Sequence, residues 1–303
     1  MAPKLNTYIK THKENEPIRP VINNTQAPSY KLAKYINKKL YHLLNLPNAY
    51  NTKNSQEIAE ELKNVKINEN TRIITLDIKD LYMNLPPKVI IKATRHWLNK
   101  NNNNREIINQ VLNILWTIMK QNYFQYKDKF YQPERGKGMG SPISGTMAET
   151  YLQYIEETNI KQWWDTGEII HYRRYVDDII IIYDTKKIQD NIIEQEINKI
   201  DENLQFKMTT EDNNTINYLD LTLKRNINTI DLSIYRKATN TDTTIHYQSN
   251  HPYEHKIAAF RYYINRMTTL PITEKSKTDE WNTIISMAAN NGYPTQIIQN
   301  LRR

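Results

Sequence analysis

Two adjacent acids, Asp177 and Asp178, stand between the short runs Tyr172–Tyr175 and Ile179–Tyr183, which are rich in aromatic and β-branched residues. This pattern predicts a β-hairpin with the two aspartates at its turn. Neighbouring carboxylates repel each other, so a divalent cation is a natural partner for a rigidly held pair. Oxygen ligands without Cys or His nearby suit Mg²⁺ or Mn²⁺ better than zinc. Asp pairs are also common at ordinary turns, so the pair alone does not establish a metal site.

A third acid, Asp77, ends the apolar and β-branched run Thr71–Leu76. The run predicts a buried strand, after which Ile78–Tyr82 turns away. An acid at the end of a buried strand has two explanations, which this stretch leaves equally open. Asp77 either caps the following segment or binds a metal ion.

Three glycines, Gly136, Gly138 and Gly140, lie just before a helical pattern that runs from Ile143 to about Ile160. Glycines at the start of a helix let backbone N–H groups approach a phosphate or a base closely. A bare glycine cluster is more often a plain turn, and this one matches neither the Walker loop nor the dinucleotide fingerprint.

The order of these features suggests one chemistry. Nucleotidyl transfer uses two divalent ions, which activate a primer 3′-hydroxyl and stabilise the leaving pyrophosphate. Such a reaction needs acids that converge from separate strands. Asp77, the glycine-rich loop and the Asp177–Asp178 hairpin follow one another in an order that satisfies this need.

Other elements must position these residues, and the apolar periodicity predicts most of them. An extended basic segment is expected at 3–20, and Ser29 is expected to cap the first helix. Further helices are predicted at 54–65, 87–98, 105–120 and 188–204 and from about His251 onward, with a β-hairpin at 123–131.

Composition bounds the class of protein. The chain has 303 residues with 41 Lys and Arg against 33 Asp and Glu, which gives a net charge of +8 and favours a polyanionic partner. The absence of cysteine excludes a disulfide framework and a thiolate zinc site. No apolar run approaches the length of a membrane span, so we expect a soluble intracellular protein without a membrane partner.

Together these motifs resemble those of reverse transcriptases, and within them those of Penelope-like retroelements. Leu76–Tyr82 is similar to motif A, Gly136–Ser144 to motif B and Arg174–Asp178 to motif C. The resemblance to the subfamily depends on short stretches along the whole chain: Lys10–Lys13, Arg19–Val21, Tyr218–Leu221, Tyr235–Asp242, Ser249–Pro252 with His255–Lys256, and Asn291–Pro294.

The resemblance implies an α+β right-hand polymerase fold. It divides the chain into partial, truncated fingers (1–70), a palm with an antiparallel sheet and motifs A, B and C (71–235, with a finger-like insertion at about 87–131), and a helical thumb with C-terminal helices (236–303). Motif B departs from the family pattern at Pro133, Gly138 and Gly145. The chain also lacks the longer N-terminal finger region and a GIY-YIG endonuclease. We therefore expect a fragment, or an element that needs a pre-existing 3′-end.

The resemblance also implies roles for individual residues. Asp77 and Asp177 are implied as the principal ligands of two Mg²⁺ ions, for which Mn²⁺ is a substitute, and Asp178 completes the acidic cluster. Tyr82 occupies the position of the steric gate, where an aromatic ring crowds a ribose 2′-hydroxyl; an ordinary core aromatic is its alternative reading. The remaining residues are implied in nucleotide binding (Arg19, Gly140, Ser141 and Pro142) and in template and primer binding (Lys10, Lys13, Tyr175, Tyr218 and Leu219), although a solvated basic stretch also explains Lys10 and Lys13.

These roles imply an RNA-directed DNA polymerase of a retrotransposable element, with an RNA template, a DNA primer and dNTPs as partners. Two alternatives stay open: a catalytically inactive, polymerase-derived nucleic-acid-binding protein, and an RNA polymerase of the same palm architecture, which Tyr82 disfavours. Nuclear residence follows from the resemblance alone, and a cytoplasmic location stays open. The sequence does not predict the oligomeric state, the host or the template.

Overall fold

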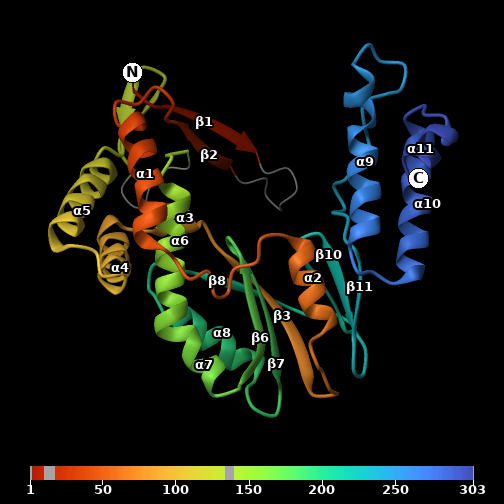
Figure 1. Cartoon of the computed structure of the whole chain (residues 1–303), viewed down its shortest axis with the longest axis horizontal. Helices are drawn as coiled ribbons and strands as arrows, with labels where there is room; N and C mark the ends of the chain where they lie inside the picture. Colours follow the sequence, from red (N-terminus) through yellow and green to blue (C-terminus); the bar gives the residue numbers. More distant parts are fainter. Residues whose placement is uncertain (1, 10–17, 134–139, 303) are drawn as a thin grey trace. The chain divides into compact units, whose positions relative to one another are not determined.

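A computed structural model describes residues 2–9, 18–133 and 140–302 (Figure 1). The chain forms two compact units, and each is assembled from separate stretches of sequence. The first comprises Met1–Asn51, Asp77–Ile169 and Ile188–Lys207, and the second comprises Thr52–Leu76, Ile170–Lys187 and Met208–Arg303. The division into fingers, palm and thumb stays a prediction.

The first unit is mainly helical. Its helices are α1 (Tyr30–Leu44), α3 (Leu81–Asn84), α4 (Pro87–Lys100), α5 (Arg105–Lys120), α6 (Ser144–Ile155) with its π-helical continuation η1 (Glu156–Ile160), α7 (Lys161–Asp165) and α8 (Asp190–Lys199). The predicted range of α5 is confirmed. Ser29 does precede α1, but its side chain makes no capping hydrogen bond. The helix predicted at 188–204 is shorter, because the chain leaves the helix at Ile200 and turns at residues 202–203.

Helix α4 packs against both α5 and α6. Trp97 on α4 is fully buried, and its indole Nε1 donates a 3.0 Å hydrogen bond to the carbonyl oxygen of Thr150 on α6. The loop between α4 and α5 is also tied to α1, since Asn103 Nδ2 donates to the carbonyl oxygen of Leu43. Burial of each large apolar side chain here stabilises the fold by about 1.5–3 kcal/mol.

A four-stranded sheet completes the first unit. Its strands are β1 (Lys4–Ile9), β2 (Ile18–Asn23), β4 (Phe124–Tyr126) and β5 (Lys129–Tyr131), in the order β2-β1-β4-β5. The hairpin predicted at 123–131 is confirmed. The extended basic segment predicted at 3–20 is only partly correct, because its described residues lie in two paired antiparallel strands. Strand β1 also pairs in parallel with β4.

A second four-stranded sheet belongs mostly to the second unit. Its strands are β6 (Ile169–Tyr175), β7 (Asp178–Asp184), β3 (Thr71–Ile78) and β8 (Phe206–Thr210), in the order β6-β7-β3-β8. Residues Ile179–Tyr183 of β7 are all buried, as expected for an apolar run in a covered sheet. Helix α2 (Ser55–Lys63) contributes Ile58, Ala59 and Leu62 to the same core.

An antiparallel three-stranded sheet follows in the sequence. It contains β9 (Thr215–Tyr218), β10 (Leu221–Arg225) and β11 (Ile230–Ile234), in the order β11-β10-β9. Its apolar residues, among them Tyr218, Leu221 and Leu223, join the core that Ile180 and Ile182 of β7 form.

The C-terminal part of the second unit is helical, as predicted. Helices α9 (Tyr253–Thr269) and α10 (Glu274–Asn290) lie side by side, and α11 (Thr295–Leu301) ends the described chain (Figure 1). They share a core of their own that includes Phe260, Ile284 and Tyr293. Gly292, with φ of +77°, forms the turn before α11 and lies so close to the His246 ring that a Cβ atom would approach it to 2.8 Å.

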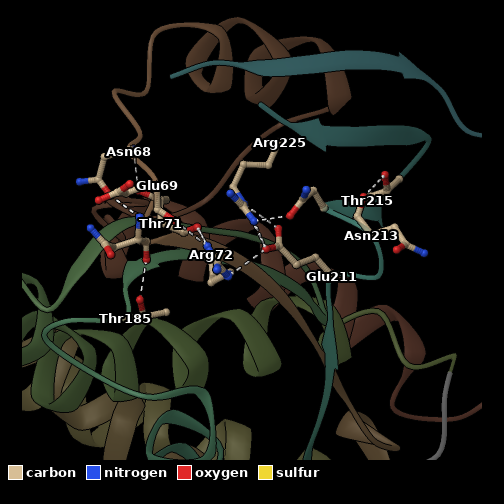
Figure 2. Close-up of polar contacts among 11 residues, drawn as sticks. Asn68, Glu69, Thr71, Arg72, Thr185, Glu211, Asn213, Thr215 and Arg225 are labelled. Carbon is tan, nitrogen blue, oxygen red and sulfur yellow. Dashed lines mark hydrogen bonds and ion pairs between the residues drawn. The ribbon is translucent and has the colours of Figure 1, made fainter. Parts of the chain in front are cut away.

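A buried ion-pair network joins strands of the two sheets in the second unit (Figure 2). Glu211 accepts hydrogen bonds from Arg225 Nε at 3.0 Å and Nη2 at 2.7 Å. Both side chains are less than a tenth exposed, and Arg72 Nε lies 3.4 Å from the same carboxylate.

No helix in the described ranges has both the length and the apolar character that a bilayer crossing requires.

Candidate active site

The predicted acidic hairpin is present and is formed by β6 and β7. Tyr175 ends β6, Val176 and Asp177 form the turn, and Asp178 begins β7. Val176 has a φ of 55°, a left-handed conformation that is unfavourable for a β-branched residue. Asp177 and Asp178 are both half-buried. The turn therefore holds two acids on a strained backbone.

Two buried side chains bond to the backbone of this turn. Arg174, which is 1% exposed, donates from Nη1 to the carbonyl oxygen of Val176 at 3.0 Å. Tyr218, which is 3% exposed, donates from its hydroxyl to the carbonyl oxygen of Asp178 at 3.1 Å. Burial, together with the nearby negative charge of Asp178, raises the pKa of the Tyr218 hydroxyl, so this group stays protonated and remains a donor.

Asp77 is the next-to-last residue of β3 and is half-buried. The strand continues to Ile78, and Asp80, not Asp77, occupies the N-cap position of α3. Of the two explanations left open by the sequence, the capping role is therefore wrong. In the sheet order β3 is the neighbour of β7, the strand that Asp178 begins.

Several predicted nucleotide-binding residues lie in the first unit. Tyr82 is half-buried in the short helix α3, and Arg19 is exposed on β2. Gly140 has a φ of +118°, and a Cβ atom there would lie 2.1 Å from the carbonyl oxygen of Ile22 on β2. The turn before α6, which also contains the half-buried Ser141 and Pro142, thus approaches β2 so closely that only glycine fits.

The predicted template- and primer-binding residues have different settings. Tyr175 is 38% exposed beside the acidic turn, and Leu219 has a φ of 54° in the turn between β9 and β10. The burial of Tyr218 argues against direct contact with a primer and for a role within the protein. Lys10 and Lys13 lie outside the described residues, as do Gly136 and Gly138.

The donor chemistry of the acids suits a hard cation, since carboxylate oxygens are the ligands that Mg²⁺ prefers. Asp77 belongs to the first unit, and Asp177 and Asp178 belong to the second. Among the described residues, no three His, Cys, Asp or Glu side chains are grouped closely enough to hold a metal ion. The carboxylate chemistry of the three acids suits Mg²⁺, whereas their joint coordination of a metal ion stays a prediction.

Similar folds occur among solved polymerase structures. A telomerase from Candida albicans in complex with a TWJ fragment of telomeric RNA is 12% identical, with a TM-score of 0.61 over 96% of this chain and 54% of that one. A telomerase from Candida tropicalis, also with a TWJ fragment, is 13% identical, with a TM-score of 0.58 over 95% of this chain and 53% of that one. The RNA-dependent RNA polymerase of a human picobirnavirus is 11% identical, with a TM-score of 0.54 over 96% of this chain and 57% of that one.

These likenesses show that the chain has the right-hand polymerase fold, and the chain spans about half the length of these solved structures. The model of the reverse transcriptase (RNA-dependent DNA polymerase) family matches residues 11–211, which is more than half of the chain. The chain therefore belongs to the reverse transcriptase family. An animal helix-turn-helix domain model matches residues 243–303, and no curated protein sequence matches.

The sequence did not predict the hydrogen bonds that Arg174 and Tyr218 donate to the backbone of the acidic turn. Both residues stood inside recognised motifs, but no local pattern indicated that their side chains reach the acidic turn. The one available signal was an arginine two residues before the turn of a hairpin whose second strand is apolar, because a buried guanidinium requires acceptors.

Proposed function

We propose that this chain is an RNA-directed DNA polymerase, which adds deoxynucleotides to the 3′-hydroxyl of a DNA primer on an RNA template. The observation that carries the proposal is the Asp177–Asp178 hairpin within a chain whose residues 11–211 match the reverse transcriptase family. Motifs A and B provide Asp77 and Gly140 in the family's order.

Each acid has a chemical task in this proposal. Asp77, Asp177 and Asp178 provide the carboxylate oxygens that hold two Mg²⁺ ions, with Mn²⁺ as a substitute. When bound, these ions activate the primer 3′-hydroxyl and neutralise charge that develops on the triphosphate. The acids come from β3 and from the turn at the start of β7, so rigid strand ends hold them.

Other residues select and orient the nucleotide. The Tyr82 ring excludes a ribose 2′-hydroxyl and so favours dNTPs over ribonucleotides. The Arg19 guanidinium, exposed on β2, pairs with the triphosphate. Gly140, Ser141 and Pro142 line the nucleotide pocket, where the lack of a side chain at Gly140 allows close approach of the backbone.

The proposed biological setting is a retrotransposable element of the Penelope-like type. Its support is the set of subfamily motifs, such as Tyr218–Leu221 and Asn291–Pro294, together with the helix-turn-helix match at the C-terminal end. Nuclear residence belongs to the same proposal and has no support besides the resemblance.

The test is extension of a DNA primer on an RNA template in Mg²⁺, with the wild-type chain beside Asp177→Asn. We expect the variant to lose at least about 100-fold in rate, because several kcal/mol of metal-centred stabilisation correspond to such a factor. Asp231→Asn, which changes an exposed acid on β11, is the matched control and keeps its activity.

Two other outcomes would point elsewhere. If the wild-type chain binds the RNA–DNA hybrid in a salt-dependent manner but extends no primer, the chain is a polymerase-derived binding protein. If it extends the primer with ribonucleotides as efficiently as with deoxynucleotides, the chain is an RNA polymerase and the role of Tyr82 is wrong.

A further inference from the structure

We infer that Arg174 and Tyr218 are positioning residues, which fix the backbone on both sides of Asp177 and so preset the acidic turn for divalent metal binding. The inference rests on the proposed function, because it concerns the same acids. It adds two residues that act through the backbone of the turn.

The first contact comes from β6. Arg174 is 1% exposed, and its guanidinium donates to the carbonyl oxygen of Val176, two residues further along the chain. A buried guanidinium requires acceptors, because its transfer from water is costly unless it is hydrogen-bonded. The backbone of Arg174 is fixed as well, since its carbonyl oxygen accepts a 2.9 Å hydrogen bond from the N–H of Thr52. The donor is therefore itself held in place.

The turn needs such a contact because its backbone is strained. Val176 has a φ of 55°. This left-handed backbone conformation costs a β-branched L-residue roughly 1–2 kcal/mol in conformational free energy. A strained residue persists only when its surroundings compensate for the strain. The bond from Arg174 ends on the carbonyl oxygen of this same residue, so it acts where the turn would otherwise relax.

The second contact comes from β9. Tyr218 is buried in the core with Ile180, Ile182 and Leu221, so its ring has little freedom to move. Its hydroxyl reaches the carbonyl oxygen of Asp178 at 3.1 Å. The carbonyl groups of Val176 and Asp178 flank Asp177, so the two bonds hold the backbone before and after this acid.

Both bonds end on backbone carbonyl oxygens and not on carboxylates. They fix the direction in which Asp177 and Asp178 leave the backbone. Metal ligands must be held within about 0.5 Å of their productive positions. Loss of either bond should therefore weaken metal binding, even where the fold survives.

The experiment compares variants that remove one donor each. Tyr218→Phe keeps the buried ring and deletes only the hydroxyl, whereas Arg174→Gln removes the guanidinium and Arg174→Lys restores a cation. Tyr151→Phe is the matched control for tyrosine, because Tyr151 is equally buried and donates its hydroxyl to Asp201 in the other unit. Arg225→Lys is the control for a buried arginine with a carboxylate partner.

The primary readout is Mn²⁺ binding to the free chain, followed by the electron paramagnetic resonance signal of unbound Mn²⁺, with Asp177→Asn defining the site. We expect Tyr218→Phe and Arg174→Gln to raise the Kd for Mn²⁺ by about tenfold, which is the size of one hydrogen bond. Arg174→Lys should recover part of the affinity. Tyr151→Phe and Arg225→Lys should lower the Tm without changing the Kd.

The second readout is the Mg²⁺ concentration that gives half-maximal primer extension, which should rise in the same two variants. The inference is overturned if Tyr218→Phe lowers the Tm as Tyr151→Phe does and leaves the Kd for Mn²⁺ unchanged, because the bond is then only structural. If Arg174→Gln fails to fold, the Kd of Tyr218→Phe for Mn²⁺ still tests the positioning role.

Failure of the proposed function gives a different result. A wild-type chain that extends no primer, but binds Mn²⁺ in an Asp177-dependent manner that Tyr218→Phe weakens, contradicts the polymerase and supports the positioning role. A wild-type chain without Asp177-dependent Mn²⁺ binding overturns both.

Discussion

At the scale of single residues, His171 is a buried histidine that links the stability of the fold to pH. It lies on β6 and is 7% exposed. Burial, with a smaller contribution from the positive charge of Arg173, lowers its pKa from 6.5 to about 4. The Glu61 carboxylate lies 3.6 Å from His171 Nε2, but it already accepts a 2.7 Å hydrogen bond from Arg173. Glu61 therefore does not offset the cost of a buried imidazolium.

The lowered pKa fixes the sign of the pH dependence. Below pH 6.5 the unfolded chain takes up a proton at this histidine, and the folded chain does so only near pH 4. The stability that the neutral, buried His171 contributes is therefore fully present above pH 6.5. It is lost as the pH falls, because protonation then favours the unfolded chain. Between pH 7 and pH 4.5 we expect a loss of about 2–3 kcal/mol in the free energy of unfolding.

Urea unfolding at pH 7, 5.5 and 4.5 measures this loss. In His171→Gln the free energy of unfolding should differ less between these pH values. His42→Gln, which changes an exposed histidine on α1, serves as the control. If the His171 variant loses as much stability on acidification as the wild-type chain, other groups carry the pH dependence.

Residue types and spacing were sufficient to predict the hairpin but not the contacts that fix it. The short runs rich in aromatic and β-branched residues on either side of Asp177 and Asp178 are a local signal, and the hairpin was predicted from it. The burial of Arg174 depends on contacts with residues distant in the sequence, such as Thr52. No local period encodes such contacts, so the role of Arg174 was not predictable.

At the scale of elements, Glu211 connects β10 to β3 through two arginines. Its carboxylate binds Arg225 at the end of β10 and lies 3.4 Å from Arg72 on β3 (Figure 2). Arg225 also donates to Asn214. Because Arg225 and Glu211 are both less than a tenth exposed, loss of Glu211 leaves the Arg225 guanidinium buried without this anionic partner.

Glu211→Ala should therefore lower the free energy of unfolding by about 3–5 kcal/mol. Arg72→Ala should cost only about 1 kcal/mol, since the Arg72 side chain is 39% exposed and water can replace its ion pair. Chemical denaturation of both variants at neutral pH measures the two values. Equal losses in the two variants would show that exposure does not govern this network.

The prediction for residues 3–20 was only partly correct. An extended basic segment was expected there because the sequence has no sustained period, and the pairing of strands β1 and β2 was not predicted. They form a sheet through their mutual register and through the pairing of Lys4 with Gln125 on β4. Pairing over such a separation is a tertiary effect, which local propensity does not contain.

At the scale of the whole molecule, the joint order of three motifs predicted the right-hand polymerase fold, and the solved polymerase structures confirm it. The fold could be predicted because motifs A, B and C together resemble those of reverse transcriptases. The arrangement of charge over the surface could not be predicted in the same way, since net charge says nothing about where the charges gather.

Helix α1 carries four of the chain's 41 Lys and Arg residues on a short stretch without acids. Because an α-helix has about 3.6 residues per turn, its buried residues Ala33, Ile36, Leu40 and Leu44 leave one side free. That exposed side carries four lysines, two tyrosines and a histidine, and the helix contains no acid: Lys31, Lys34, Tyr35, Lys38, Lys39, Tyr41 and His42. Lysines interleaved with exposed aromatic rings are typical of surfaces that bind single-stranded nucleic acid.

A net charge of +8 permits two kinds of nucleic-acid binding. The nucleic acid is either attracted by the net charge of the whole surface or bound through contacts with α1. If α1 contacts the phosphates, Lys34→Glu with Lys38→Glu should weaken binding of a single-stranded RNA. It should also reduce the slope of log K against log salt by about 1.4, since each phosphate contact contributes about 0.7. Tyr35→Ala with Tyr41→Ala should weaken binding by about 1–3 kcal/mol per stacked base and leave the slope unchanged.

Fluorescence anisotropy with a labelled RNA at several salt concentrations measures both quantities. The matched control is Lys161→Glu with Lys199→Glu, which makes the same change of charge at exposed lysines on α7 and α8. Because the net charge falls equally in both double variants, a diffuse attraction predicts equal losses of affinity. Only a larger loss in the α1 variant, with the smaller salt slope, places the contact on this helix.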